Sequence, residues 1–147
     1  EEETKKVLND GWLSTGDIGH FENKYLKITD RKKDILITPG GDNISPIKIE
    51  NDLLKISFVE QTLVYGDNKP YLVALLVLSK EKSNLSNEII LKEIEKVNKN
   101  LTKIEKIKKF IVVKDQFTIE NGLITPTLKL KRYKIIKKYK NQLENLY

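Results

Sequence analysis

Two apolar segments on either side of a short turn constrain the fold of this chain most. Residues 59–65 (VEQTLVY) and 71–78 (YLVALLVL) are rich in Val, Leu and Tyr, and Gly66-Asp67-Asn68-Lys69-Pro70 lies between them. β-Branched and aromatic residues favour strands, and a Gly, Asn and Pro cluster is typical of the turn that joins two strands. We therefore expect an antiparallel hairpin at the centre of a sheet.

Helical patterns surround this hairpin. Ser45-Pro46 predicts an N-cap and a first-turn proline for a helix of about ten residues. Apolar residues three and four positions apart predict one bent helix or two helices between 86 and 109, with Ser86 as the N-cap. Its members are Ile90, Ile94, Val97, Leu101, Ile104 and Ile107. With a strand at 110–113 and an amphipathic helix at 133–147, the order indicates an α+β fold: a small mixed sheet with helices packed on it.

The first thirty residues predict a separate hairpin. Residues 12–15 and 25–28 have strand character, and we expect them to pair antiparallel around Glu22-Asn23-Lys24. Two strands alone are marginal in water, so this hairpin should need a neighbouring sheet. The chain starts at Glu1 and contains no Met. We therefore expect it to be part of a longer protein.

Composition excludes several classes of site. The chain has no Cys and one histidine, His20, so it can form neither a disulfide nor a multi-histidine zinc cluster, and it has no thiol nucleophile. No apolar run approaches the ~20 residues of a membrane span, and no signal peptide is visible. These features are compatible with a cytoplasmic location, with or without peripheral association with a membrane.

Basic charge is concentrated in residues 129–140, which hold seven Lys and Arg residues and no acid in a chain of net charge +6. Such a strip indicates either a phosphate-bearing ligand or polyanion, or a solvated helix face. One alternative function is a small basic module that binds nucleic acid or an anionic membrane surface. No nucleic-acid motif is present, and Tyr133 and Tyr139 are too few for a stacking series, so we expect no nucleic-acid partner.

Three sequence blocks carry a family resemblance. They are Ser14-Thr15-Gly16-Asp17, the segment from Asp30 to Pro46 (DRKKDILITPGGDNISP), and Thr125-Pro126-Thr127-Leu128-Lys129-Leu130-Lys131-Arg132. In this order and spacing they resemble the adenylate-forming acyl-CoA synthetases, closest to the long-chain fatty acid–CoA ligases. The resemblance implies that residues 1–31 end a large N-terminal domain with a hairpin and hinge. Residues 32–147 would form the mobile C-terminal lid domain.

The resemblance assigns Asp17 and Arg31 to ATP. A carboxylate can accept two hydrogen bonds from the ribose hydroxyls, and the arginine fork suits the ribose and phosphate edge. The structural alternatives are an aspartate that caps a turn and a surface ion pair of Arg31 with Asp30 or Asp34.

Lys33 matches the family's pivot, where an exposed charged residue tolerates two solvated conformations. Gly40 and Gly41 match the loop that lines the pantetheine tunnel of coenzyme A, because glycine lets a narrow ligand approach the backbone. The alternative for the glycine pair is a simple turn ahead of a helix.

Lys129 matches the catalytic lysine, whose ammonium would neutralise charge while a carboxylate attacks the α-phosphorus and pyrophosphate leaves. Many relatives carry a Gly-Lys pair here, whereas Leu128 precedes Lys129, as in the long-chain type. That difference favours a fatty acid substrate, although other adenylating enzymes share these blocks. If the segment is a strand, Lys131 lies on the same face as Lys129. The assignment of the catalytic lysine therefore stays open between Lys129 and Lys131.

In the second half-reaction that the resemblance implies, a thiolate attacks the acyl-adenylate. The chain has no Cys, so that thiol must come from the other substrate, coenzyme A. The expected substrates are ATP, a fatty acid and coenzyme A, with Mg²⁺ bound by the missing large domain and no metal site within these residues. Without that domain, we expect no ligase activity from this polypeptide alone.

Overall fold

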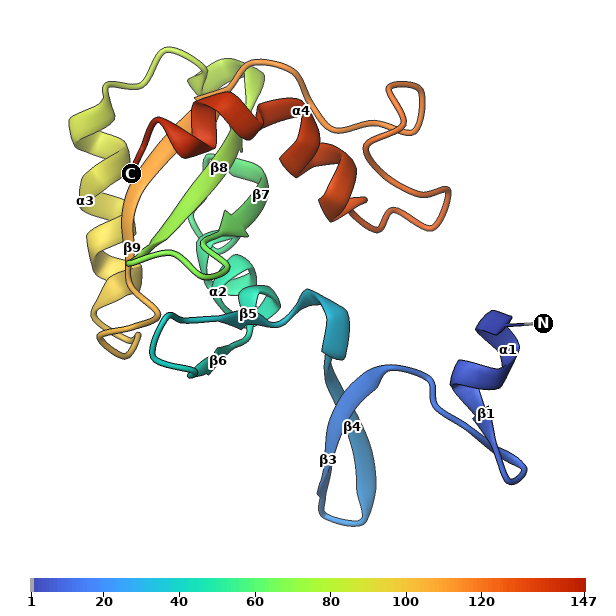
Figure 1. Ribbon diagram of the computed structural model, residues 1–147. Coiled ribbons are helices and arrows are strands. Elements are labelled where there is room, and N and C mark those ends of the chain that lie inside the picture. Colours follow the sequence, from blue (N-terminus) through green and yellow to red (C-terminus); the bar gives the residue numbers. More distant parts are fainter. Residues whose placement is uncertain (1) are drawn as a thin grey trace. The chain divides into compact units, whose positions relative to one another are not determined.

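The computed structural model describes residues 2–147. The backbone divides into two compact units, one ending at Ile35 and the other running from Leu36 to Tyr147 (Figure 1).

The first unit consists of one short helix and two antiparallel hairpins. Its elements are α1 (Glu2–Val7), β1 (Leu8–Asn9), β2 (Trp12–Leu13), β3 (Asp17–Glu22), β4 (Tyr25–Arg31) and a 3₁₀ turn (Lys32–Asp34). Each hairpin closes on two residues with positive φ, Asp10-Gly11 (47° and 81°) and Asn23-Lys24 (47° and 71°). This geometry is that of two-residue hairpin turns, whose twist matches the strands they join.

The predicted partner of residues 12–15 is wrong. β2 pairs with β1, and β4 pairs with β3. The physical reason is the tight turn at Asp10-Gly11, which folds Trp12 directly back onto the residues before the turn.

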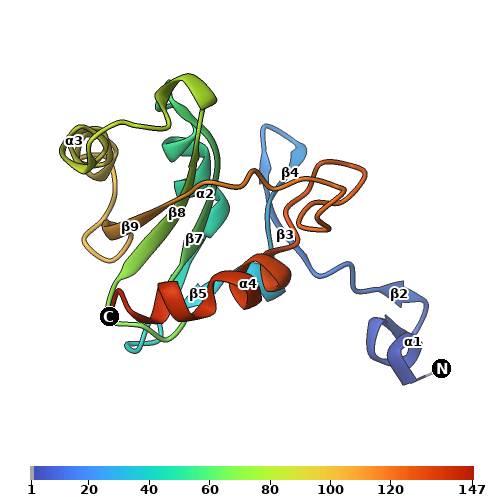
Figure 2. The same ribbon diagram turned by 90° about the horizontal axis from the view of Figure 1, so that it is seen from above.

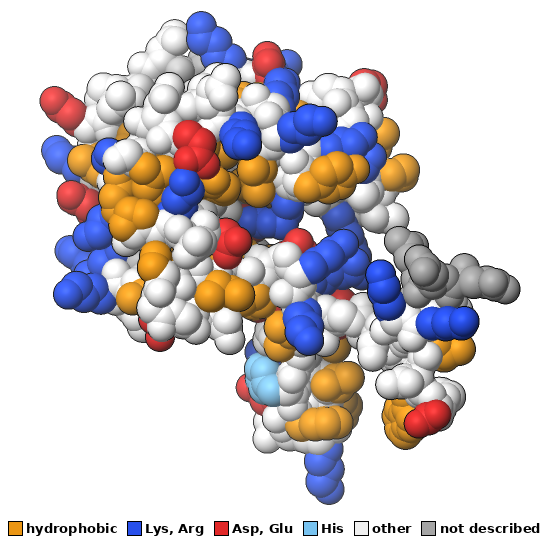
Figure 3. Space-filling view, viewed as in Figure 1, with side chains coloured by type: hydrophobic (Ala, Val, Ile, Leu, Met, Phe, Trp, Pro, Cys, Tyr) orange, Lys and Arg blue, Asp and Glu red, His pale blue; other side chains and the backbone are white. Residues whose placement is uncertain are grey.

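Apolar side chains of the first unit lie on its surface. Trp12, Phe21 and Tyr25 are 81%, 77% and 79% exposed. Hydrophobic side chains are visible along the β3–β4 hairpin beside His20, the single pale blue side chain in Figure 3. No apolar side chain that the structure describes in this unit is buried, so the two short hairpins enclose no core of their own.

A three-stranded mixed sheet organises the second unit. Its elements are β5 (Leu36–Ile37), β6 (Asn43–Ile44), α2 (Pro46–Leu53), β7 (Val59–Tyr65), β8 (Leu72–Leu78), a 3₁₀ turn (Lys80–Lys82), α3 (Asn87–Asn98), β9 (Ile107–Val113) and α4 (Arg132–Glu144). The strand order is β7-β8-β9, with β7–β8 antiparallel and β8–β9 parallel. The predicted antiparallel hairpin is confirmed, but only its second strand, β8, lies at the centre of the sheet, and β7 lies at the edge. The α+β fold with helices on a small mixed sheet is confirmed.

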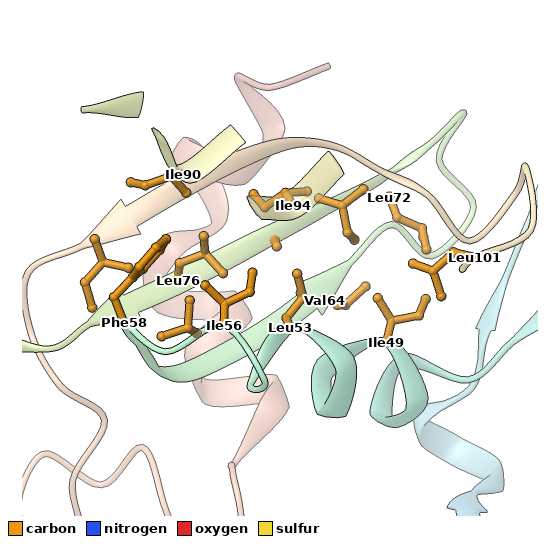
Figure 4. Close-up of a cluster of buried hydrophobic side chains, with 14 of the residues drawn as sticks. Ile49, Leu53, Ile56, Phe58, Val64, Leu72, Leu76, Ile90, Ile94 and Leu101 are labelled. Atoms are coloured by element: carbon orange, nitrogen blue, oxygen red, sulfur yellow. The ribbon is translucent and has the colours of Figure 1, made fainter. Parts of the chain in front are cut away.

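The central strand β8 is buried along its whole length because both faces of the sheet are covered. Leu72, Leu76 and their neighbours on one face pack against α2 and α3, through side chains such as Ile49 and Ile94 (Figure 4). The alternate residues of β8 pack against α4 and the loop around Phe117. Figure 2 shows α3 and α4 on opposite sides of this sheet.

The helix predicted between 86 and 109 is shorter than expected. α3 ends at Asn98, whose side-chain amide donates to Ile107 O at 2.9 Å and accepts from Ile107 N at 2.9 Å. The amide thereby replaces a backbone partner for the first residue of β9, and Ile107 joins the sheet. The Ser86 side chain makes no cap hydrogen bond, whereas Ser45 Oγ accepts from Lys48 N at 3.2 Å as predicted for α2.

No helix in the described part of the chain combines the length and apolar character that a membrane crossing requires.

Candidate functional site

The structure brings together the two residues predicted to contact ATP. Asp17 and Arg31 are opposite each other in the β3–β4 register, and Arg31 Nε donates to Asp17 Oδ1 at 3.2 Å. Their side chains are 30% and 50% exposed, so a ligand can reach both. Asp17 N donates to Thr15 Oγ1 at 3.1 Å, which fixes the backbone that carries the carboxylate.

Arg31 does not form the ion pair suggested as its structural alternative. Its partner is Asp17 across the hairpin, not Asp30 or Asp34. Asp30 is itself buried, and its Oδ1 has no hydrogen-bond partner among the described residues. The difference arises because neighbouring strand residues point to opposite faces, which separates Asp30 from Arg31.

Lys33 is exposed and lies in the middle of the 3₁₀ turn Lys32–Asp34. Arg31 before the turn (φ −107°, ψ 134°) and Ile35 after it (φ −60°, ψ 132°) both have extended backbone. A single turn between two extended residues constrains the chain through few hydrogen bonds. Lys33 thus combines an exposed side chain with a weakly constrained backbone, as a pivot requires.

Gly40 and Gly41 form the turn between β5 and β6. Gly41 N donates to Thr38 O at 2.9 Å, and Thr38 Oγ1 accepts from Asp42 N at 3.0 Å. Gly41 has φ +88°, so the turn itself explains this glycine. Gly40 has no such φ, and a Cβ there would meet Asp42 Oδ2 at 3.4 Å, an ordinary contact. The fold therefore does not require the absence of a side chain at Gly40.

Lys129 lies at the end of a tight loop, and its side chain is exposed. The loop is closed by an antiparallel bridge between Ile124 and Leu130, and Thr125 N donates to Lys129 O at 2.8 Å. Thr125 Oγ1 accepts from Lys129 N at 3.0 Å. Leu128 has φ +60°, a left-handed conformation that glycine adopts most easily. Leu128 therefore occupies the position at which a Gly-Lys pair would place its glycine.

Lys129 and Lys131 do not lie on one strand face, because no continuous strand runs through them. Lys131 is half-buried, its N–H donates to Leu123 O at 2.8 Å, and it directly precedes α4. Lys129 is the more exposed of the two.

A buried ion pair next to this loop was not predicted as part of the site. Arg132 Nη1 donates to Glu50 Oε1 at 2.7 Å, and Arg132 Nη2 donates to Val64 O at 2.7 Å. Glu50 Oε1 also accepts from Val64 N at 2.7 Å. The available sequence signal was an acid beside Ile49 on the apolar side of α2, together with an arginine in a segment that contains no acid.

The basic strip is not one free cationic face. Arg132 is held in the pair with Glu50, and Lys138 Nζ lies 3.6 Å from Asp115. Lys131 is half-buried, whereas Lys129, Lys134, Lys137 and Lys140 are exposed. Among the side chains that the structure describes, those of residues 4–147, no group of three or more His, Cys, Asp or Glu residues could hold a metal ion.

Comparison with known proteins defines the class. Residues 33–147 match the AMP-binding enzyme C-terminal domain, and the chain belongs to this family. It is 37% identical over 170 residues to long-chain-fatty-acid–CoA ligase 5 of Mus musculus, covering 99% of this chain and 25% of that protein. It is 31% identical over 169 residues to the long-chain-fatty-acid–CoA ligase FadD15 of Mycobacterium tuberculosis, covering 100% of this chain and 28% of that protein.

A solved structure is similar in fold. The A domain of carboxylic acid reductase from Segniliparus rugosus, in complex with AMP and a co-purified carboxylic acid, superposes with a TM-score of 0.89 at 29% identity. The match covers 99% of this chain and 25% of that one. The chain thus spans about a quarter of the length of the relatives it matches.

Proposed function

We propose that this chain is the C-terminal portion of a long-chain fatty acid–CoA ligase, which adenylates a fatty acid with ATP and transfers the acyl group to coenzyme A. The observation that carries the proposal is the position of Lys129, exposed at the exit of a hydrogen-bonded loop. The similarity to long-chain ligases over the whole chain supports a long-chain fatty acid as the substrate.

In the first half-reaction, a carboxylate oxygen of the fatty acid attacks the α-phosphorus, and the bond from that phosphorus to the pyrophosphate oxygen breaks. The Lys129 ammonium neutralises charge on the entering and leaving oxygens. Asp17 accepts hydrogen bonds from the ribose, and Arg31 binds the ribose and phosphate edge. Their exposure and their mutual hydrogen bond are compatible with these roles.

In the second half-reaction, the thiolate of coenzyme A attacks the acyl carbonyl carbon, and AMP leaves. The pantetheine arm of coenzyme A lies along the Gly40-Gly41 turn. Lys33 is the pivot between the conformations for adenylation and for thioester formation. In this proposal, residues 1–31 form the end of the large domain and residues 32–147 form the mobile domain. The division of the backbone after Ile35 lies in the same segment.

The proposed partners are the fatty acid, ATP, coenzyme A and a large N-terminal domain that carries the remaining pockets. Mg²⁺ would accompany ATP and be bound by that domain, and no step here depends on it. We propose a cytoplasmic location with peripheral access to membranes, since exposed lysines such as Lys134 and Lys137 suit an anionic lipid surface.

The test is to assay the complete protein that contains this chain with ATP, coenzyme A and carboxylic acids of increasing chain length. We expect acyl-CoA, AMP and pyrophosphate to form, with a preference for long chains. Residues 1–147 alone should form none. Preference for a short or aromatic acid would reject the substrate class, and acyl-CoA from the isolated chain would reject its dependence on a larger domain.

A further inference from the structure

Val64 is buried, and it directs two backbone groups away from its partner strand at the edge of the sheet. It is paired with Ala74 in the β7–β8 ladder, and no other strand in the described part of the chain pairs with β7. In an antiparallel ladder, alternate residues direct both N–H and C=O away from the partner strand. At Val64 these groups bond to side chains instead: the N–H to Glu50 and the C=O to Arg132. The two charged residues therefore replace a missing strand at one position.

Glu50 and Arg132 are also bonded to each other, through Arg132 Nη1 and Glu50 Oε1 at 2.7 Å. Their side chains are only 9% and 13% exposed. Removal of either partner would leave a buried charge uncompensated, so the pair strongly favours one arrangement. The arginine fork bonds a carboxylate and a carbonyl at once, which a lysine ammonium cannot do with the same geometry.

This arrangement fixes the start of α4, and the start of α4 fixes Lys129. Arg132 is the first residue of α4 and follows Lys129 by three positions. Between them, Leu130 bridges to Ile124 and Lys131 N bonds to Leu123 O, so the segment has little freedom to move independently. Lys129 itself forms no ion pair among the residues that the structure describes.

We propose that Glu50 and Arg132 are positioning residues for adenylation: their pair anchors the backbone from which the Lys129 ammonium reaches the reacting phosphate. The proposal rests on the proposed role of Lys129. A lysine side chain is long and flexible, so its ammonium can be preorganised only if its backbone is held. A displacement of about 1 Å in such a group can reduce a rate by about 10²-fold.

The test compares the two half-reactions in the complete enzyme. Glu50→Gln keeps the size of the side chain and removes its charge. We expect adenylate formation to fall about tenfold or more, with thioester formation from supplied acyl-adenylate unchanged. Arg132→Lys, which keeps a positive charge but loses the fork, should act in the same direction. Equal loss of both half-reactions in these variants would overturn the proposal.

A matched control is present in the same unit. Glu105 accepts from Lys48 Nζ of α2 at 2.9 Å, and this pair includes no residue of α4. Glu105→Gln should therefore leave both half-reactions unchanged. If Glu105→Gln reproduces the Glu50→Gln profile, the effect is general destabilisation and the proposal fails.

A double-mutant cycle separates positioning from a merely structural role. If Glu50 acts through Lys129, then Glu50→Gln should have no further effect on adenylation in a Lys129→Ala background. Additive losses would overturn the proposal.

Amide hydrogen exchange provides a readout that does not depend on activity. Exchange at Lys129 N and Lys131 N should become faster in Glu50→Gln and stay unchanged in Glu105→Gln. Unchanged exchange in Glu50→Gln would reject the anchoring. If exchange is faster in Glu50→Gln but the Lys129→Ala variant retains full adenylation, the proposed role of Lys129 is rejected, and with it the catalytic purpose of the anchor.

Discussion

Arg31 Nε donates a hydrogen bond to Asp17 Oδ1 at 3.2 Å, across fourteen residues of sequence. The pair is half exposed, and exposed ion pairs contribute about 0–1 kcal/mol to stability. A structural role alone therefore gives little reason for these two residues, whereas a ligand that bonds to both would gain two charge-assisted contacts.

We predict that Asp17→Ala raises the KM for ATP about tenfold or more, since a hydrogen bond to a charged group contributes about 1.5–3 kcal/mol. The free energy of unfolding should change by less than about 1 kcal/mol. Initial rates at varied ATP and urea denaturation measure the two quantities. Glu22→Ala, which breaks the Lys27–Glu22 pair on the same hairpin, is the control and should leave the KM unchanged. An unaltered KM in Asp17→Ala would remove Asp17 from the nucleotide site.

Lys129→Ala in the complete enzyme should reduce adenylate formation by about 10²–10³-fold, the usual cost of losing one preorganised donor. Thioester formation from supplied acyl-adenylate should be retained. Pyrophosphate release and acyl-CoA formation are measured separately. Lys137→Ala, at an exposed position of α4, should affect neither step. Comparable losses in both half-reactions would mean that Lys129 does not have the assigned role.

Lys33→Pro should separate the two half-reactions. Proline fixes φ near −65°, which the 3₁₀ turn at Lys32–Asp34 accepts but which restricts rotation about this residue. We expect one half-reaction to be largely lost and the other retained, whereas Lys33→Ala should retain both. Single-turnover assays of each step provide the measurement. If the proline variant performs both steps at the normal rate, the pivot is elsewhere.

Leu128→Gly should not destabilise the chain, although glycine usually does. The left-handed conformation at φ +60° costs a non-glycine residue about 1–2 kcal/mol, and glycine removes that cost. Ile119→Gly, at an exposed loop residue without positive φ, should lower the free energy of unfolding by about 0.4–1 kcal/mol. Urea denaturation of both variants tests the difference. Equal destabilisation would show that Leu128 is not strained.

The hydroxyl of Tyr65 predicts a pH effect on stability. Burial, and then the hydrogen bond to Glu144 at 2.6 Å, raise the pKa of Tyr65 from 10.0 to about 12. The folded state therefore holds this proton more tightly, and the stabilisation is complete below pH 10 and is lost as the pH rises towards 12. The difference in free energy of unfolding between the wild type and Tyr65→Phe should shrink over that interval. A difference that does not vary with pH would contradict the assignment.

Local sequence signals predicted the parts of this fold that depend on neighbouring residues. The alternating and β-branched residues of β7 and β8 predicted the hairpin, and Ser45-Pro46 predicted the start of α2. The prediction failed where two local solutions competed. Residues 12–15 have strand character whichever partner they take, and the Asp10-Gly11 turn decided the pairing. At Asn98, a side chain that bonds to Ile107 ended a helix that the apolar spacing would have continued.

By itself, the sequence determined the family resemblance, the order of the elements and the identity of the candidate residues, because these depend on residue type and spacing along the chain. Only the tertiary structure decided which charges meet. Asp17 meets Arg31, and Glu50 meets Arg132 at the edge of β7, because strand register and helix packing bring distant residues within hydrogen-bond distance. Charge pairing depends on distances in space, and spacing in the sequence does not specify those distances.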